Sequence, residues 1–134
     1  MTGPAESRVE TTPPAPVIRL ETLKKRPDFL RAARARRSHV PGFLLQARER
    51  GPGGDAGRVI RVGVTCSRKL GNAVTRNRAK RRLREVARLV LPGQGRSGWD
   101  YVLVGRPGVT VTRSFDALLA DLRAALGKIH TGAR

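Results

Sequence analysis

The chain has 134 residues, enough for one domain with a modest core, and its formal net charge is +18 at pH 7. Hydrophobic residues make up 39% of it and aromatic residues only 4%, so aliphatic side chains must fill most of the core. Such an excess of positive charge destabilises a compact state unless a polyanion is nearby, which indicates nucleic acid or an anionic membrane surface as a partner. No apolar run approaches the roughly 20 residues of a membrane-spanning helix.

Residues 1–19 are rich in Pro, Thr, Ala and Glu and have no periodic apolar face. This composition predicts a disordered tail before a folded domain over residues 20–130. The N-terminus lacks the charged start and apolar stretch of a secretion signal. The single cysteine, Cys66, has no partner for an internal disulfide and is interpreted as a small strand residue rather than a nucleophile. Together these observations predict a cytoplasmic protein.

Three segments follow before the most charged part of the chain. A helix is predicted over residues 26–38, with Phe29 on its apolar face. Alternation of apolar and polar residues predicts strands over residues 43–48 and 59–67. The Gly- and Pro-rich residues 51–58 between them are typical of a hairpin loop. The apolar face of the second strand carries Ile60, Val62, Val64 and Cys66.

A basic helix is predicted over residues 72–91, with Asn72 as its N-cap. From Arg68 to Arg88 the chain contains nine Lys or Arg and a single acid, Glu85. On a helical wheel the apolar side chains form one narrow seam and the cations cover the other side. Like charges four residues apart cost roughly a few tenths of a kcal/mol per pair, so a helix selected for stability alone would contain more acids. The seam consists of Ala79, Leu83, Val86 and Val90.

The cations of this helix suit a phosphate backbone. Arg outnumbers Lys among them, and the planar guanidinium group makes bidentate contacts with phosphate. A helix lying on a membrane surface is the alternative. The apolar seam is small, lacks aromatic residues and is needed for packing on the sheet, so a nucleic acid is favoured over a membrane.

The remaining elements complete the fold. The segment PGQGRSG is predicted to end the basic helix before residue 92, and a third strand is predicted over residues 99–107. A short additional strand is expected around residues 109–112, and a closing helix over residues 114–129 has Ser114 as its cap. This order predicts an α+β fold, a small α–β sandwich in which helices pack on one side of an open sheet. The closing helix has an apolar stripe formed by Phe115, Leu118, Leu119, Leu122, Ala125, Leu126 and Ile129.

The segment RKLGNAVTRNRAKRRLREV resembles the signature of the bacterial ribonuclease P protein family, in which a GNAV turn and an Arg-Asn-Arg triplet lead into a basic helix. The segments LKKRPDF, RVGVTCSRK and WDYVLVGRP are similar to neighbouring parts of that family, so the resemblance covers residues 20–129. It implies the protein subunit of an RNA-based endonuclease that removes the 5′ leader of precursor tRNA. It also implies a left-handed crossover at the basic helix, although such connections are normally right-handed.

The resemblance implies ribonuclease P RNA and precursor tRNA as partners, no membrane, and no catalytic residue in the protein. Mg²⁺ is expected to be bound mainly by the RNA subunit; consistently, the sequence shows neither a paired-carboxylate arrangement nor a zinc-ligand spacing. The implied contacts with the catalytic RNA are Lys69, Arg76, Asn77, Arg78, Lys80, Arg81 and Arg84. The leader is expected in a cleft between the first helix and the sheet, formed by Phe29, Arg31, Arg61 and Arg68.

The sequence departs from the family at Ala33 and near Gln46, where the family often has aromatic residues. Base stacking in the cleft is therefore expected to be weaker, with a larger part for charge. Phe29 stacks on a base or packs in the core, and the sequence supports both equally. Two other functions compete: a ribosomal structural protein shares the size and charge but has no reason to carry GNAVTRNRAKRR, and a protein-only nuclease needs acidic metal ligands that the sequence lacks.

Overall fold

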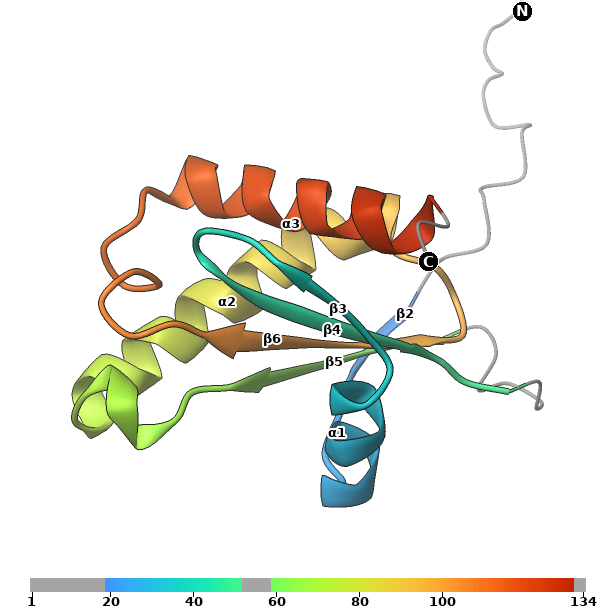
Figure 1. Ribbon diagram of the computed structural model, residues 1–134, viewed down its shortest axis with the longest axis horizontal. Helices are drawn as coiled ribbons and strands as arrows, with labels where there is room; N and C mark the ends of the chain where they lie inside the picture. The colour runs from blue at the N-terminus through green and yellow to red at the C-terminus, as the bar shows by residue number, and fades with distance from the viewer. Residues whose placement is uncertain (1–18, 52–58, 132–134) are drawn as a thin grey trace, which may run out of the picture.

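The computed structural model describes residues 19–51 and 59–131 (Figure 1). The predicted tail lies outside these residues except for Arg19, which begins the first strand. The elements in chain order are β2 (Arg19–Thr22), α1 (Arg26–Ala33), β3 (Arg36–His39), β4 (Phe43–Glu49), β5 (Val59–Thr65), the 3-10 turn η3 (Arg68–Leu70), α2 (Ala73–Gln94), β6 (Trp99–Gly105) and α3 (Phe115–His130).

The strands form one mixed sheet in the order β2-β5-β6-β4-β3. β5 is parallel to both of its neighbours, whereas β4 is antiparallel to β6 and to β3. The strand β6 lies between β4 and β5, so the predicted hairpin between those two strands is wrong. Every residue of β6 except Val104 is buried, and a strand that is apolar on both faces belongs in the centre of a sheet.

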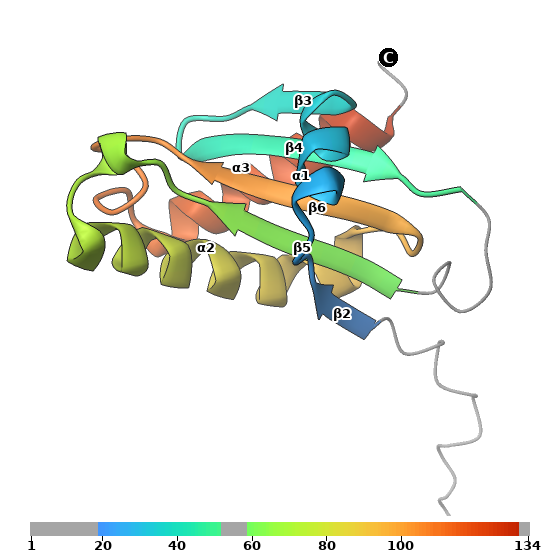
Figure 2. The ribbon, with the colours of Figure 1, turned by 90° about the horizontal axis from the view of Figure 1, so that it is seen from below.

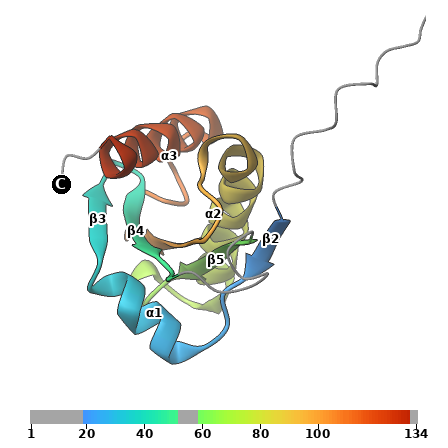
Figure 3. The same cartoon turned by 90° about the vertical axis from the view of Figure 1, so that its right-hand side faces the viewer.

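Helices cover both faces of the sheet, which corrects the prediction of a one-sided sandwich (Figures 1 and 3). Helices α2 and α3 lie together on one face, and α1 lies on the other. The α1 side has a small core of its own, in which Ala32 and the partly buried Phe29 pack on Leu23 and Val102.

The main core lies between the sheet and the pair α2 and α3. The predicted α2 seam, the apolar face of β5 and the α3 stripe all take part in it, which confirms the three periodicities. β4 adds Phe43, Leu45 and Ala47, each fully buried at alternate positions. The core is therefore aliphatic, as the composition predicts, with Phe43, Trp99 and Tyr101 as its buried aromatic residues in the described chain.

Both predicted helix caps are confirmed. The Asn72 side chain accepts a hydrogen bond from the Thr75 N–H at 2.9 Å, and the Ser114 hydroxyl accepts one from the Ala117 N–H at 3.1 Å. The prediction that α2 ends before residue 92 is wrong, because the helix includes Pro92 in its last turn and ends at Gln94. Proline there removes only one N–H, and the Gly95 N–H closes the turn on the Leu91 carbonyl at 2.7 Å.

Short elements account for two further corrections. The predicted first helix is too long, because α1 ends at Ala33 and Arg36–His39 form β3 against β4. Residues 109–112 form a turn instead of a strand, since the Thr110 and Arg113 N–H groups bond back to Arg106 and Val109. Four-residue segments have no measurable period, so their tertiary partners decide their structure.

The connection from β5 through α2 to β6 is left-handed. The two strands are parallel neighbours, and Figure 1 places α2 above the sheet. Figure 2 views the sheet from below, with both arrows pointing left and β6 drawn above β5. With the strands turned to point upward, β6 lies to the right of β5 and the helix lies behind, which is the reverse of the usual hand. The hand implied by the resemblance is thus confirmed.

Candidate nucleic-acid interface

The exposed side of α2 is a continuous basic surface. The buried residues of the helix include the predicted seam together with Ala87 and Leu91, so the cations occupy the remaining circumference. Lys80 and Arg76 are half-buried, with their stems along the edge of the seam. The exposed polar residues on this surface are Asn77, Arg78, Arg81, Arg84 and Arg88.

Almost none of this charge is neutralised within the protein. In the described part of the chain, the single ion pair on α2 joins Arg88 to Glu85, with Nε 3.0 Å from Oε1. The hydrogen bond from Arg88 lowers the pKa of the Glu85 carboxyl. The other candidate RNA contacts have no ion-pair partner among residues 19–51 and 59–131. Arg78, Arg81 and Arg84 therefore present their charges directly to solvent.

A tight turn places the Arg-Asn-Arg triplet at the start of α2. The Ser67 hydroxyl accepts a hydrogen bond from the Lys69 N–H at 3.3 Å and caps η3. Gly71 then has a φ of 136°, a conformation that favours glycine. Asn72 follows directly as the cap of α2. The GNAV segment is thus a connector that fixes Lys69 and the first turn of α2 in one region.

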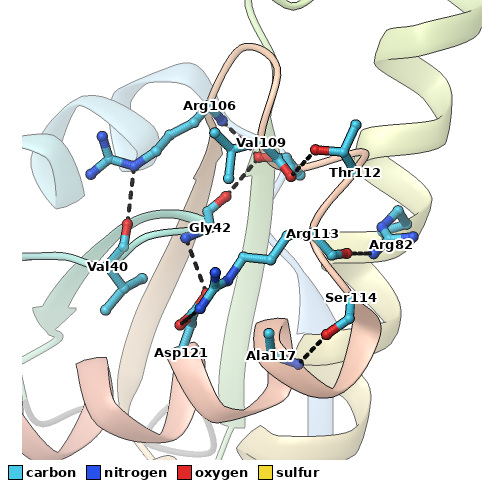
Figure 4. A network of polar contacts seen from close by, with 11 residues as sticks. Val40, Gly42, Arg82, Arg106, Val109, Thr112, Arg113, Ser114, Ala117 and Asp121 are labelled. Atoms are coloured by element: carbon cyan, nitrogen blue, oxygen red, sulfur yellow. Dashed lines mark hydrogen bonds and ion pairs between the residues drawn. The ribbon is translucent and has the colours of Figure 1, made fainter.

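Arg82 does not belong to the exposed basic surface. Its guanidinium group donates a hydrogen bond to the carbonyl of Arg113, in the loop between β6 and α3 (Figure 4). Arg113 in turn makes a bidentate contact with the buried carboxylate of Asp121, at 2.6 Å and 3.0 Å. Asp121 also accepts the Gly42 N–H at 3.0 Å. This network joins α2, α3 and the β3–β4 turn, so Arg82 has a structural role.

The leader cleft was expected between the first helix and the sheet, and two adjoining hollows lie near that place, beside β2. The first, of about 230 Å³, is lined by Phe29 from α1, by residues of β2 and β5, and by Arg84 and Arg88 of α2. It opens where β2 ends and the edge of β5 continues without a neighbour. The second, of about 350 Å³, is lined by Asp28 and Arg61 and shares the end of β2 with the first.

Phe29 both packs in the protein and borders the first hollow. Its ring lies against Gly63, where a Cβ atom would be only 2.5 Å from Cε1 of the ring. Gly63 is therefore required for the close approach of α1 to β5. The side chain is partly buried in the α1 core and still lines the hollow, so the two alternatives for Phe29 are compatible.

The structure separates the four predicted leader contacts. Arg61 lines the second hollow, where its guanidinium group lies 3.8 Å from the Asp28 carboxylate, and Arg31 binds the same acid at 2.9 Å. Arg31 is exposed on α1 and Arg68 is exposed on η3, and neither lines the two hollows. The sequence prediction missed two cations of the second hollow, although the run KKR before α1 was a signal for them. They are Lys24 and Lys25.

The single cysteine, Cys66, lies near cations of α2. The thiol of Cys66 is half-buried, and burial raises its pKa despite the nearby cations of α2, which makes it a poor nucleophile. Within the described residues, no three His, Cys, Asp or Glu side chains form a group that could hold a metal ion. None of the helices described is long and apolar enough to cross a membrane.

Comparisons with known proteins agree with this arrangement. The sequence model of the family described as Ribonuclease P matches residues 18–130. The ribonuclease P protein component of Ruegeria pomeroyi is 63% identical over 111 residues, which are 83% of this chain and 87% of the relative. That of Caulobacter vibrioides is 49% identical over 109 residues, covering 81% and 70%.

Solved structures show the same fold. The RNase P protein of Staphylococcus aureus superposes with a TM-score of 0.64 at 23% identity, covering 81% of this chain and 94% of that chain. The RNase P protein of Thermotoga maritima gives 0.60 at 27% identity, covering 76% and 91%. The family match and the sequence relatives show that the chain belongs to the bacterial ribonuclease P protein family, the protein component of an RNA-catalysed endoribonuclease that acts in the 5′ maturation of tRNA.

Proposed function

We propose that the exposed face of α2 and the turn before it bind the ribonuclease P RNA. The observation that carries the proposal is the row of cations without ion-pair partners in the described chain. The rigid helix fixes the spacing of these cations. Binding to a phosphate backbone therefore loses little conformational entropy apart from that of the ends of the arginine side chains. The proposed contacts are Lys69, Arg76, Asn77, Arg78, Lys80, Arg81 and Arg84.

We assign the 5′ leader of precursor tRNA to the hollows beside β2. Phe29 supplies an aromatic surface for a base, and Arg61 supplies charge for a phosphate. Lys24 and Lys25 add two exposed cations at the same place. Arg31 and Arg68 lie outside the hollows, so we propose that they attract the leader by their charge without contacting it in the hollows.

In this proposal the protein positions RNA and leaves the chemistry to its RNA subunit. Mg²⁺ is assigned mainly to that subunit, as the resemblance to the family implies. The domain over residues 20–130 acts in the cytoplasm, as the lone cysteine and the resemblance suggest.

Cleavage of precursor tRNA by reconstituted enzyme tests the proposal. The full-length protein is expected to restore cleavage by its RNA subunit at low Mg²⁺. The reason is that the protein's lysine and arginine side chains replace part of the Mg²⁺ that screens repulsion between RNA phosphates. Arg78→Ala is expected to weaken this rescue, and Arg123→Ala is the matched control, since Arg123 is an exposed cation on α3. An unchanged cleavage rate with and without protein at every Mg²⁺ concentration would contradict the proposal.

A further inference from the structure

A groove along the free edge of β3 is not used by the proposed function. β3 pairs only with β4 and ends the sheet on the side away from β2, with α3 on one side of it and α1 on the other (Figure 3). A space of about 610 Å³ opens between β3 and the last turn of α3. The side chains that matter for its chemistry are Arg36, Arg37, Ser38, His39 and Lys128.

Ser38 has a buried hydroxyl that lacks a partner. The residue is 5% exposed, and its Oγ atom makes no hydrogen bond in the described structure. A buried hydroxyl without a partner destabilises a protein, and such groups are rare in folded chains. Because Ser38 lines the groove, a ligand there can supply the missing partner.

The backbone of β3 also presents hydrogen-bonding groups to the groove. The Val40 N–H donates to the Phe43 carbonyl at 3.1 Å, so the backbone of Val40 points toward β4. Backbone groups alternate in direction along a strand, so those of Arg37 and His39 point away from the sheet. Among residues 19–51 and 59–131, these two N–H donors have no backbone partner and lie along the open edge, and edges of this kind pair readily with another chain or ligand.

The charge of the groove is positive. Arg36 donates to the Ile129 carbonyl at 2.8 Å, and Arg37 donates to the Ala33 carbonyl at 3.1 Å. These bonds place a cation over the C-terminal carbonyls of α3 and α1, which would otherwise repel an anion. Each guanidinium group keeps further N–H donors, and Lys128 is exposed. The residues that line the groove include no acid.

We propose that this groove binds the phosphate backbone of a second RNA strand. The proposal rests on the assignment of the protein as an RNA-binding subunit, but it concerns the opposite edge of the sheet from β2 and its hollows. The positive lining favours a polyanion over a neutral peptide, and a strand of RNA matches the donors of Ser38 and the β3 edge. The protein would then connect two RNA segments, one on α2 and one on β3.

The decisive variant is Ser38→Ala, because a structural role and a binding role predict different results. Removal of an unsatisfied buried hydroxyl is expected to raise the melting temperature of the free protein by ~3 °C. The same change is expected to weaken RNA binding about 5-fold, because it removes one hydrogen bond to the ligand. The double variant Arg37→Gln with Lys128→Gln is expected to lower the slope of log K against log salt by about 2. The control is Arg123→Gln, an exposed cation of α3 outside the groove.

Binding is measured with ribonuclease P RNA alone and with the same RNA plus precursor tRNA, which identifies the strand that occupies the groove. Hydrogen exchange provides an independent readout, since the outward amides of Arg37 and His39 are expected to become protected in the complex. Unchanged affinity, salt slope and amide exchange in both arms would overturn the inference, as would protection of β3 only by an added acidic protein. If Arg78→Ala still weakens binding in that case, the proposed function stands; if it does not, that function fails separately.

Discussion

Arg82 and Arg78 belong to the same helix and are expected to give opposite results when each is replaced by alanine. Arg82 is half-buried and donates to the Arg113 carbonyl, so its side chain holds the β6–α3 loop on α2. Arg78 is exposed and has no hydrogen bond or ion pair in the described chain. Arg82→Ala should therefore affect folding, and Arg78→Ala should affect RNA binding.

The structure gives the expected size of each effect. A hydrogen bond from a charged group contributes about 1.5–3 kcal/mol, and partial exposure of Arg82 places it near the lower value. For a domain of this length, a loss of about 1.5 kcal/mol lowers the melting temperature by about 6 °C. Arg78→Ala should change stability by less than about 0.5 kcal/mol. It should reduce the slope of log K against log salt by about 1, the value for one lost phosphate contact.

Two assays on the same protein samples separate these outcomes. Thermal unfolding is followed by the fluorescence of Trp99, the single tryptophan, which is buried in the main core. Binding to ribonuclease P RNA is titrated at several salt concentrations, at a temperature where both variants are folded. An Arg82→Ala protein that lowers the salt slope as much as Arg78→Ala, with an unchanged melting temperature, would contradict the separate roles of the two arginines.

Three further predictions follow from buried contacts. Burial and the nearby charges of Arg96 and Arg36 lower the pKa of His130 to about 4. The neutral imidazole therefore contributes fully to stability above pH 6.5, and this contribution is lost as the pH falls toward 4. Urea unfolding of His130→Asn should show a weaker pH dependence of the unfolding free energy over that range than the wild type. Gly42→Ala places a Cβ atom 2.4 Å from Leu118 and should cost about 1–3 kcal/mol of unfolding free energy, whereas the control Gly127→Ala has open space and should be neutral or stabilising. Phe29→Leu should keep the melting temperature within a few degrees and weaken binding of precursor tRNA with a long leader more than binding of leaderless tRNA, and equal losses for both RNAs would count against a leader contact.

The long elements could be predicted from the sequence because their periodicity is strong and local. The α2 seam and the α3 stripe each repeat over about three to four turns, and their caps, Asn72 and Ser114, act on residues three positions away. The family match decides between the two RNA-binding alternatives, in favour of a ribonuclease P component over a ribosomal protein. The motif that distinguished them in the sequence was GNAVTRNRAKRR.

The sheet order and the position of α1 could not be derived from the same local patterns. β2 and β3 have four residues each, which is too short for a periodic signal. One usable signal was missed: β6 is apolar on both faces, with Val102 on the α1 side and Leu103 on the other. A strand of that kind requires cover on both sides, so at least one helix had to pack on the second face.

The sequence could not show which residues of the protein individual cations contact, because those partners are distant in the chain. Arg61 lies 3.8 Å from Asp28, and Arg82 reaches the Arg113 carbonyl. The sequence positions of these pairs are 33 and 31 residues apart, respectively, and no local pattern connects them. The charge run indicated a basic surface on α2, but it could not identify which arginines the fold itself uses.

The placement of the acids explains why the charge on α2 remains available. In the described chain, the paired acids outside α2 are Asp28, Asp100 and Asp121, and they bind cations of α1, β4, β5 and the loops. Glu85 is the one acid within α2, and it pairs with Arg88 toward the C-terminal half of the helix. The cations in the first three turns of α2 thus repel one another in the free protein. Successive turns of a helix are about 5.4 Å apart, which is within the Debye length of about 8 Å, so salt does not fully screen this repulsion. A bound polyanion relieves that repulsion, so RNA should stabilise the native state in proportion to its affinity. The same acids could have been placed on α2 to stabilise the free protein; their pairing elsewhere leaves the cations of α2 available for the proposed RNA contacts.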